Sequence, residues 1–205
     1  MKTALISVSN KDGLEELVPI LVKYDFRIIS SGGTARKIRS LGYEVIEVGD
    51  YTGYPESPDG LVKTLQPKIH GGILLNPDNP THNEYMKQQG IKPIDLVVVN
   101  LYPFEKVIQE DRVDFYRVVD NIDIGGPAMI RAAVKGALLK GSPVVVIDPK
   151  QYKLVIDELE KNDGNILPKV VGYLAVEAIK RTQSYDSAIM KYMDRLYEGV
   201  SDLMS

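Results

Sequence analysis

Cysteine is absent from this sequence of 205 residues, which excludes disulfides, thiolate metal sites and cysteine nucleophiles. Long apolar runs are also missing: none approaches the ~20 residues that span a bilayer, and the N-terminal run is too short for a signal peptide. No basic tract stands out and the net charge is -3, which argues against a nucleic-acid binder. A small anionic ligand remains compatible with this charge. These absences indicate a cytoplasmic protein that acts without a membrane.

The composition indicates one globular unit. Hydrophobic residues make up 44% and charged residues 26% of the chain, ordinary values for a protein with a packed core. A length of 205 residues suits one large domain, so we expect residues 1–205 to form a single domain.

Strand-like and helix-like segments alternate through the first two thirds of the chain. Short apolar runs predict strands at residues 3–8, 26–29, 43–48, 96–100 and 144–147. The segments that follow the first two runs predict helices at 13–23 and 35–41. The run 96–100 is apolar on both faces, as in a buried parallel strand. This alternation predicts an α/β fold with a parallel sheet flanked by helices.

The last third of the sequence has a helical pattern. We expect helices at 151–161, 170–181 and 185–203, which would make residues 149–205 a helical extension of an α/β core at 1–148. Residues 50–80 are rich in Gly, Pro, Asp and Asn and predict a long functional loop.

Two predicted strand ends carry residues that suit a phosphate. Ser30-Ser31-Gly32-Gly33-Thr34 lies between a strand and a helix, where glycines admit an anion and the helix offers unpaired N–H groups. Ser7-Val8-Ser9-Asn10-Lys11 adds hydroxyls and an ammonium at another strand end. The alternative is that Ser9 and Thr34 only cap helices. Neither loop matches a dinucleotide fingerprint or a P-loop.

Three further segments concentrate reactive groups: 60–72, 100–104, and 121–127, which runs into a helix with Arg131 and Lys135. Each side chain also has an ordinary structural alternative. Lys63 and Lys135 could be solvated lysines, and Tyr102 could pack against the sheet. Asp123 could cap the following helix, and His70 could be a packed or capping histidine. An acid, two lysines and a tyrosine at predicted loops and helix ends indicate a site, but spacing does not establish that they converge.

Together these segments resemble the N-terminal cyclohydrolase domain of the bifunctional purine biosynthesis proteins, the IMP cyclohydrolase family. The resemblance covers nearly the whole chain. Its motifs occur in the family's order at residues 7–11, 31–34, 50–56, 62–65, 100–104, 121–126, 131–135 and 184–186.

The resemblance implies a methylglyoxal-synthase-like fold and a reaction: the dehydrative ring closure of 5-formamidoimidazole-4-carboxamide ribotide to inosine monophosphate, with no cofactor or metal. It implies catalysis by Lys63, Tyr102, Asp123 and Lys135. It also implies that the nucleotide is bound by Ser7, Ser9, Lys11, Ser31, Gly32, Gly33, Thr34, Thr64, Asn100, Ile124 and Gly125.

The transformylase domain of the family does not follow in this sequence, which indicates either a stand-alone cyclohydrolase or one domain of a longer protein. A homodimer and a separate transformylase partner remain open alternatives.

The sequence departs from the family pattern at three places. Leu61 stands where the family often has Arg, and Gln66 replaces a common His. Gly136-Ala137 follows Lys135 where Asn-His is usual, which predicts the loss of polar groups beside the site.

Two rival functions share the predicted fold and phosphate loops. One is a methylglyoxal-synthase-like lyase acting on a triose phosphate, and the other is a module that senses a nucleotide without catalysis. The joint presence of the four catalytic candidates favours the cyclohydrolase over both.

Overall fold

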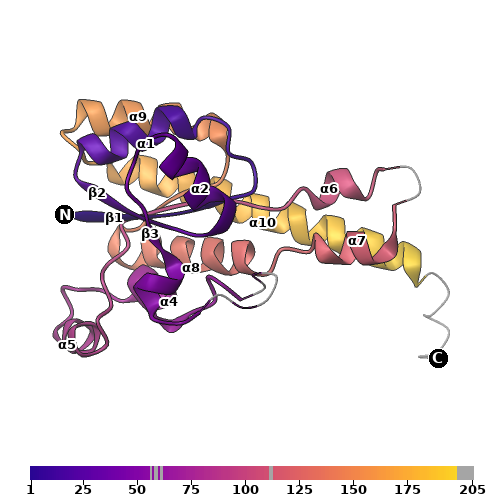
Figure 1. Ribbon diagram of the computed structural model, residues 1–205, viewed down its shortest axis with the longest axis horizontal. Coiled ribbons are helices and arrows are strands. Elements are labelled where there is room, and N and C mark those ends of the chain that lie inside the picture. The colour runs from indigo at the N-terminus through magenta and orange to yellow at the C-terminus, as the bar shows by residue number, and fades with distance from the viewer. Residues whose placement is uncertain (56, 58–59, 61, 111–112, 198–205) are drawn as a thin grey trace.

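The computed structural model describes residues 1–55, 57, 60, 62–110 and 113–197 of the chain. Its centre is one sheet of five parallel strands in the order β3-β2-β1-β4-β5 (Figure 1). The strands are β1 (Lys2–Val8), β2 (Phe26–Ser30), β3 (Ile46–Glu47), β4 (Leu96–Asn100) and β5 (Val144–Val146). The predicted α/β fold with a parallel sheet is confirmed.

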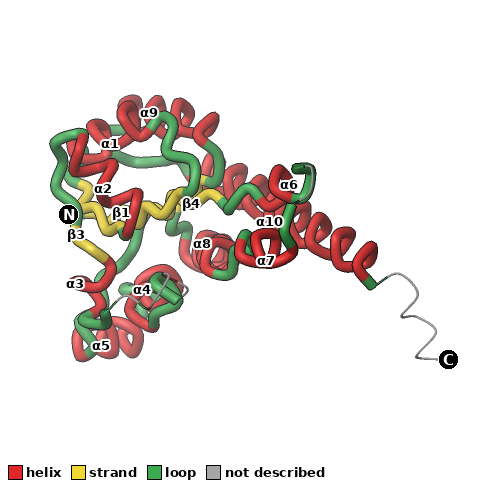
Figure 2. Tube along the Cα trace, turned by 45° about the vertical axis from the view of Figure 1, so that its right-hand side comes forward, coloured by secondary structure: helices red, strands yellow, loops and turns green. Residues whose placement is uncertain are grey.

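Helices cover both faces of this sheet. One layer contains α1 (Leu14–Lys23), α2 (Gly32–Ser40) and α9 (Tyr152–Lys161), and α8 (Gly125–Lys140) and α4 (Pro67–Leu74) lie on the opposite side (Figures 1 and 2). Since both faces are covered, the central strands are apolar on both sides, and the residues of β4 from Leu96 to Val99 are all buried.

The strand order places a ligand crevice between β1 and β4. From β1 the chain proceeds to β2 on one side of the sheet, whereas β4 pairs with β1 on the other side. Val8 lies opposite Asn100 in the register, so the two strands end level with each other. Open parallel sheets bind their ligands outside the carboxyl ends of strands at such a reversal.

Two predicted elements in the middle of the chain are wrong in extent. The strand expected at 43–48 is reduced to β3, which pairs with β2 only through Ile46 and Glu47, and Val48 already begins α3 (Val48–Thr52). The long loop expected at 50–80 contains α4, which has a proline at its start and buries Ile69 and Ile73. Helix α5 (Pro80–Gln88) follows it.

The two helices expected at 170–181 and 185–203 are one helix in the structure, α10 (Pro168–Leu196). The polar residues between the two predictions do not break it. The hydroxyl of Thr182 donates to the carbonyl of Ala178, and that of Ser184 donates to Arg181, so both satisfy themselves on their own helix. Residues 198–203 of the prediction lie outside the described residues.

The C-terminal part of α10 extends away from the sheet as a helical arm. Helices α6 (Phe104–Val107) and α7 (Phe115–Asp120) accompany it, as both views show (Figures 1 and 2). The first part of α10 packs against α8 and the edge strand β5. Helix α9, which follows a 3₁₀ helix at Pro149–Gln151, packs against α1.

The division of the chain at residue 148 stays a prediction. Among the described residues, no helix has both the length and the apolar character to cross a membrane.

Candidate functional site

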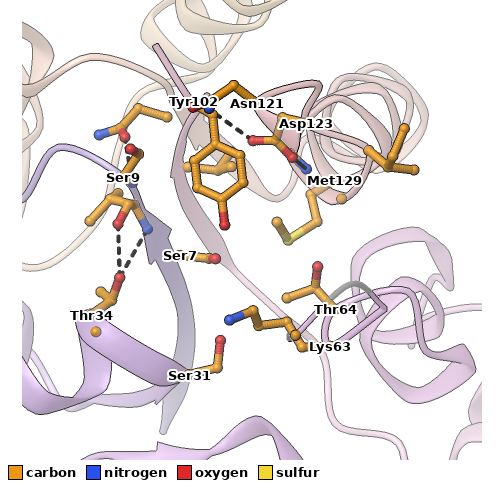
Figure 3. A pocket seen from close by; sticks show the side chains of 18 of the residues that line it. Ser7, Ser9, Ser31, Thr34, Lys63, Thr64, Tyr102, Asn121, Asp123 and Met129 are labelled. Carbon is orange, nitrogen blue, oxygen red and sulfur yellow. Dashed lines mark hydrogen bonds between the residues drawn. The ribbon is translucent and has the colours of Figure 1, made fainter. Parts of the chain in front are cut away.

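A cavity of about 410 Å³ opens at the carboxyl ends of β1, β2 and β4, where the strand order reverses. The structure brings most of the predicted site residues to its wall (Figure 3). They are Ser7, Ser9, Lys11, Ser31, Gly33, Thr34, Lys63, Thr64, Asn100, Tyr102, Asp123, Ile124 and Gly125.

The ends of β1 and α2 are joined by Thr34. Its hydroxyl accepts a hydrogen bond from the Val8 N–H (3.2 Å) and donates to the Val8 carbonyl (3.0 Å). Thr34 therefore links β1 to α2 by hydrogen bonds and does not cap a helix. The alternative that Ser9 and Thr34 are N-caps is wrong, because the N-cap residue of α1 is Gly13 and that of α2 is Ser31.

Two hydroxyls at this end of the cavity are available to a ligand. Among the described residues, the structure gives the side chains of Ser7 and Ser31 no hydrogen-bond partner, although Ser31 is only 7% exposed. Ser31 also directly precedes α2, and the backbone N–H groups in the first turn of a helix point out of its N-terminal end without a partner in the helix.

Two lysines approach the glycine turn that begins α2. Gly32 has a φ of +55°, a left-handed conformation that favours glycine. A Cβ on Gly32 would lie 3.2 Å from Lys63 Nζ, and one on Gly33 would lie 3.3 Å from Lys11 Cε. Lys11 Nζ itself donates to the carbonyl of Ser9 (3.1 Å). The two glycines thus leave room for two ammonium groups beside the hydroxyls, which makes this end of the cavity suited to an anion.

Asn100 fixes the loop after β1 from the end of β4. Its Oδ1 accepts from the amides of Ser9 (2.7 Å) and Asn10 (2.9 Å), and its Nδ2 donates to the Asn10 carbonyl (2.8 Å). All three interactions hold the backbone, so Asn100 shapes the site.

Asp123 and Tyr102 lie at the other end of the cavity, where two loops meet. Asp123 Oδ1 accepts from the Gly126 N–H (2.7 Å) and Oδ2 from the Tyr102 N–H (3.3 Å). Burial raises the pKa of Asp123, and these two hydrogen bonds only partly oppose the shift. A carboxylate with a raised pKa in a cleft is a candidate acid or base.

Side chains from both ends of the cavity point into it. In Figure 3 the Tyr102 hydroxyl, the Ser7 hydroxyl and the Lys63 ammonium are directed toward the same space. The first turn of α8 lies beside them, since Gly125 and Gly126 line the cavity, and it contributes amides and the positive end of a helix dipole. This end therefore combines a carboxylate and a phenol with backbone donors, and the Lys63 ammonium faces them from the glycine turn.

Two predicted site residues do not line the cavity. Gly32 is one of them, and it lies next to the Lys63 ammonium. Lys135 is exposed on α8, ten residues beyond Gly125, which corresponds to about 15 Å along a helix. Its role in catalysis stays a prediction.

Two of the departures from the family pattern, at Gln66 and at Gly136-Ala137, do not line the cavity. Gly136 is buried in α8, and a Cβ there would come within 2.7 Å of the Ile73 carbonyl oxygen. Gly136-Ala137 thus allows α8 to pack closely on α4, and the expectation that it removes polar groups beside the site is wrong. Gln66 is the residue before α4. Leu61, like Glu56 of the 50–56 motif, lies outside the described residues.

His70 belongs to α4, where its Nδ1 lies 3.4 Å from the carbonyl oxygen of Gln66. It does not line the cavity, which agrees with the packed alternative. Within the part of the chain that the structure describes, no three His, Asp or Glu side chains gather to hold a metal ion.

Several residues of the cavity wall were not predicted as site residues: Val8, Gly60, Val99, Asp120, Asn121, Ile122, Gly126 and Met129. Asn121, Ile122 and Gly126 lie within the 121–127 segment that the sequence singled out. Met129 follows Gly125 at helical spacing, so the position of the helix start could have indicated it.

Comparison with family models gives two matches. Residues 13–128 match a model described as "MGS-like domain", and residues 141–204 match one described as "AICARFT/IMPCHase bienzyme". Together they cover strands β2 to β5 and the C-terminal helices, whereas β1 lies before the first match.

Comparison with curated proteins finds bifunctional purine biosynthesis proteins named PurH. The chain is 47% identical over 195 residues to that of Bradyrhizobium diazoefficiens, covering 95% of this chain and 36% of the relative. It is 46% identical over 192 residues to that of a Thermoanaerobacter species, covering 94% and 37%. The chain therefore spans little more than a third of the length of these relatives.

Comparison with solved structures finds one described as "Crystal structure of ForH". It superposes with a TM-score of 0.81 and 31% sequence identity, over 92% of this chain and 97% of that chain.

Proposed function

Since this chain belongs to the MGS-like domain family, joined here to a segment that matches the AICARFT/IMPCHase bienzyme, we propose that it is an IMP cyclohydrolase. It closes the second ring of a purine by converting 5-formamidoimidazole-4-carboxamide ribotide into inosine monophosphate. The observation that carries this proposal is a single cavity with anion-binding groups at one end, Tyr102 and Asp123 at the other, and the Lys63 ammonium reaching from the glycine turn into the space between them (Figure 3).

The phosphate of the ribotide binds at the glycine turn. The hydroxyls of Ser7 and Ser31 donate to its oxygens, and the amides at the start of α2 add backbone donors. Lys11 supplies charge from one side of the turn. Charge-assisted hydrogen bonds of this kind are about twice as strong as neutral ones.

The heterocycle then extends toward Asp123. The amides at the start of α8, next to Ile124 and Gly125, donate to the carboxamide oxygen of the substrate. This contact leaves the carboxamide nitrogen near Asp123 and directs the formyl group toward Lys63 and Tyr102.

Ring closure forms a bond between the carboxamide nitrogen and the formyl carbon and then releases water. Both groups are unreactive because their nitrogen lone pairs are delocalised. The site holds the substrate in the rotamer in which these two groups touch. In favourable intramolecular reactions such orientation lowers the activation free energy by up to ~7–11 kcal/mol.

The side chains then manage charge and protons. Asp123 takes the proton that the attacking nitrogen loses, which the raised pKa of this carboxyl favours. Lys63 stabilises the negative charge that appears on the formyl oxygen. Tyr102 passes a proton to that oxygen, which becomes a hydroxyl, and Tyr102 recovers a proton from Asp123. The formamido nitrogen then loses its hydrogen to the departing hydroxyl as the C=N bond forms, so that the oxygen leaves as water. The earlier steps use side chains of the cavity, and no cofactor is included in the proposal.

The test is an ultraviolet assay for inosine monophosphate with no metal or cofactor added. We expect Lys63→Ala to reduce turnover by at least about 100-fold, the usual effect of removing an oxyanion donor, while nucleotide binding changes far less. Lys68→Ala is the matched control, because Lys68 lies on α4 and does not line the cavity. A Lys63→Ala enzyme within a few-fold of the parent rate would remove Lys63 from the mechanism.

The same preparation separates the rival functions. Consumption of dihydroxyacetone phosphate would identify a lyase of the methylglyoxal synthase type. Nucleotide binding without any turnover would identify a sensing module.

The proposal extends to compartment and partners. The substrate is a small-molecule nucleotide made by a formyl-transfer reaction, so a transformylase, on a longer chain or on a separate one, supplies it in the cytoplasm. A homodimer is part of the proposal and is tested by the mass of the protein in solution.

A further inference from the structure

The hydroxyl of one buried tyrosine on α10 holds the loop that carries Asp123. Tyr185 has no solvent exposure and lies 62 positions after Asp123 in the sequence. Its hydroxyl accepts a hydrogen bond from the Asp123 N–H (2.8 Å) and donates to the Asn121 carbonyl (2.9 Å). Both polar atoms that it contacts are backbone atoms of the loop just before α8.

The ring of the same tyrosine contacts the second loop of the site. Phe104, two residues after Tyr102, packs edge-on against Tyr185 with ring centroids 6.0 Å apart. The Arg181 guanidinium lies 5.4 Å from the Tyr185 ring centroid and pairs with Glu105 through both of its terminal nitrogens. Tyr185 therefore touches the elements that place both Tyr102 and Asp123.

These contacts converge on one polar interaction inside the cavity. The Tyr102 N–H donates to Asp123 Oδ2, so the geometry between the two loops determines how the carboxylate is aimed. A shift of either loop changes this 3.3 Å contact and the position of Asp123 relative to the substrate.

We propose that Tyr185 is a positioning residue that fixes the Asp123 carboxylate against the Tyr102 loop for ring closure. The proposal rests on the function proposed above. Tyr185 does not line the cavity and touches no substrate atom, so its effect acts through Asp123.

The hydroxyl has this role rather than the ring alone. A phenylalanine would fill the same space, and a buried hydroxyl is costly unless both its donor and its acceptor are used, as they are here. Burial, together with the nearby charges of Asp123 and Glu105, raises the pKa of Tyr185 to about 12, so its proton stays available to Asn121.

The chain offers a matched control on the same helix. Tyr192 also packs edge-on against Phe104, with centroids 5.9 Å apart, but among the described residues its hydroxyl has no hydrogen-bond partner. Tyr185→Phe and Tyr192→Phe therefore make the same chemical change around the same ring, and only the first releases the Asp123 loop.

The experiment compares steady-state ring closure by the two variants and the parent chain. For Tyr185→Phe we expect kcat to fall by about tenfold or more, because misplacement by about 1 Å can cost 100-fold. KM and the affinity for inosine monophosphate should stay within about threefold, because the phosphate end is untouched. Tyr192→Phe should match the parent in both constants.

Two results would overturn the inference. One is a Tyr185→Phe enzyme with the kcat of Tyr192→Phe. The other is an equal loss of kcat and nucleotide affinity, which would indicate general damage to the fold. If the parent chain forms no inosine monophosphate, the proposed function fails and the role of Tyr185 in ring closure fails with it, whereas the measurement below still tests whether Tyr185 holds the Asp123 loop.

Hydrogen exchange in the parent chain tests the contact without any substitution. If Tyr185 accepts from Asp123, that amide should exchange at least about 100-fold more slowly than an unstructured amide, although it lies outside any helix. Exchange at the unprotected rate would overturn the inference, even where Tyr185→Phe fails to fold.

Discussion

A methyl group placed on Gly126 should displace the proposed catalytic carboxylate. Gly126 is buried in the first turn of α8, and a Cβ there would lie 2.6 Å from Asp123 Oδ2 and 2.5 Å from Leu101 Cδ2. Ordinary van der Waals contact begins near 3.4 Å, so the Asp123 oxygen must move by roughly 0.8 Å to accommodate an alanine.

This displacement predicts a specific loss of turnover. A shift near 1 Å at a reacting group can cost about 100-fold in rate, so we expect Gly126→Ala to reduce kcat by about that factor in the ultraviolet assay. Overpacking should lower the free energy of unfolding by about 1–3 kcal/mol. The preference of a helix for alanine over glycine offsets about 0.5–1 kcal/mol of this loss.

Gly172→Ala is the matched control for this experiment. Gly172 is an exposed position within α10, and a Cβ there meets nothing within 4 Å. We expect unchanged turnover and a gain of about 0.5–1 kcal/mol in the free energy of unfolding. The reasoning would be refuted if Gly126→Ala kept a rate within about threefold of the parent, or if both variants lost activity equally.

Two further substitutions test the two ends of the cavity. Asn100→Asp loses the donor to Asn10 and adds a negative charge near the phosphate, so titration should show the Kd for inosine monophosphate rising about tenfold or more, and less at high salt. Asp123→Asn should reduce turnover by about 100-fold or more at neutral pH. Since burial raises the pKa of Asp123, its ionised form costs stability above that pKa, and the cost disappears as pH falls through it. The parent should therefore gain Tm relative to Asp123→Asn as the pH falls, and a Tm difference that does not change with pH would contradict this.

The outline of the fold could be read from local patterns. The run 96–100 predicted a strand buried on both faces, and the structure has that strand as β4. The alternation of strands and helices predicted the parallel sheet, because the period of apolar residues reports which faces are covered.

Element boundaries depended on contacts that local patterns do not encode. The gap predicted at 182–184 vanished because the hydroxyls of Thr182 and Ser184 bond to their own helix and Tyr185 is buried. Similarly, the strand at 43–48 was overestimated because a strand at the edge of the sheet extends only as far as its neighbour pairs with it.

The candidate site shows the same division. Strand ends with serines and glycines indicated an anion site, since the carboxyl ends of parallel strands share one edge. Lys135 was grouped with Lys63 and Asp123 by residue type, yet helix geometry carries it away from the cavity.

The sequence by itself determined the parallel α/β sheet and the serine and glycine loops at the ends of its strands, because each of these is written in consecutive residues. Only the tertiary structure decided which groups meet. The meeting of Tyr185 with Asp123, or of Gly136 with Ile73, joins residues more than sixty positions apart in the chain. The physical reason is that such contacts arise when whole helices pack against each other. The local period of apolar residues shows which face of a helix is buried, but not which residues of another helix it meets.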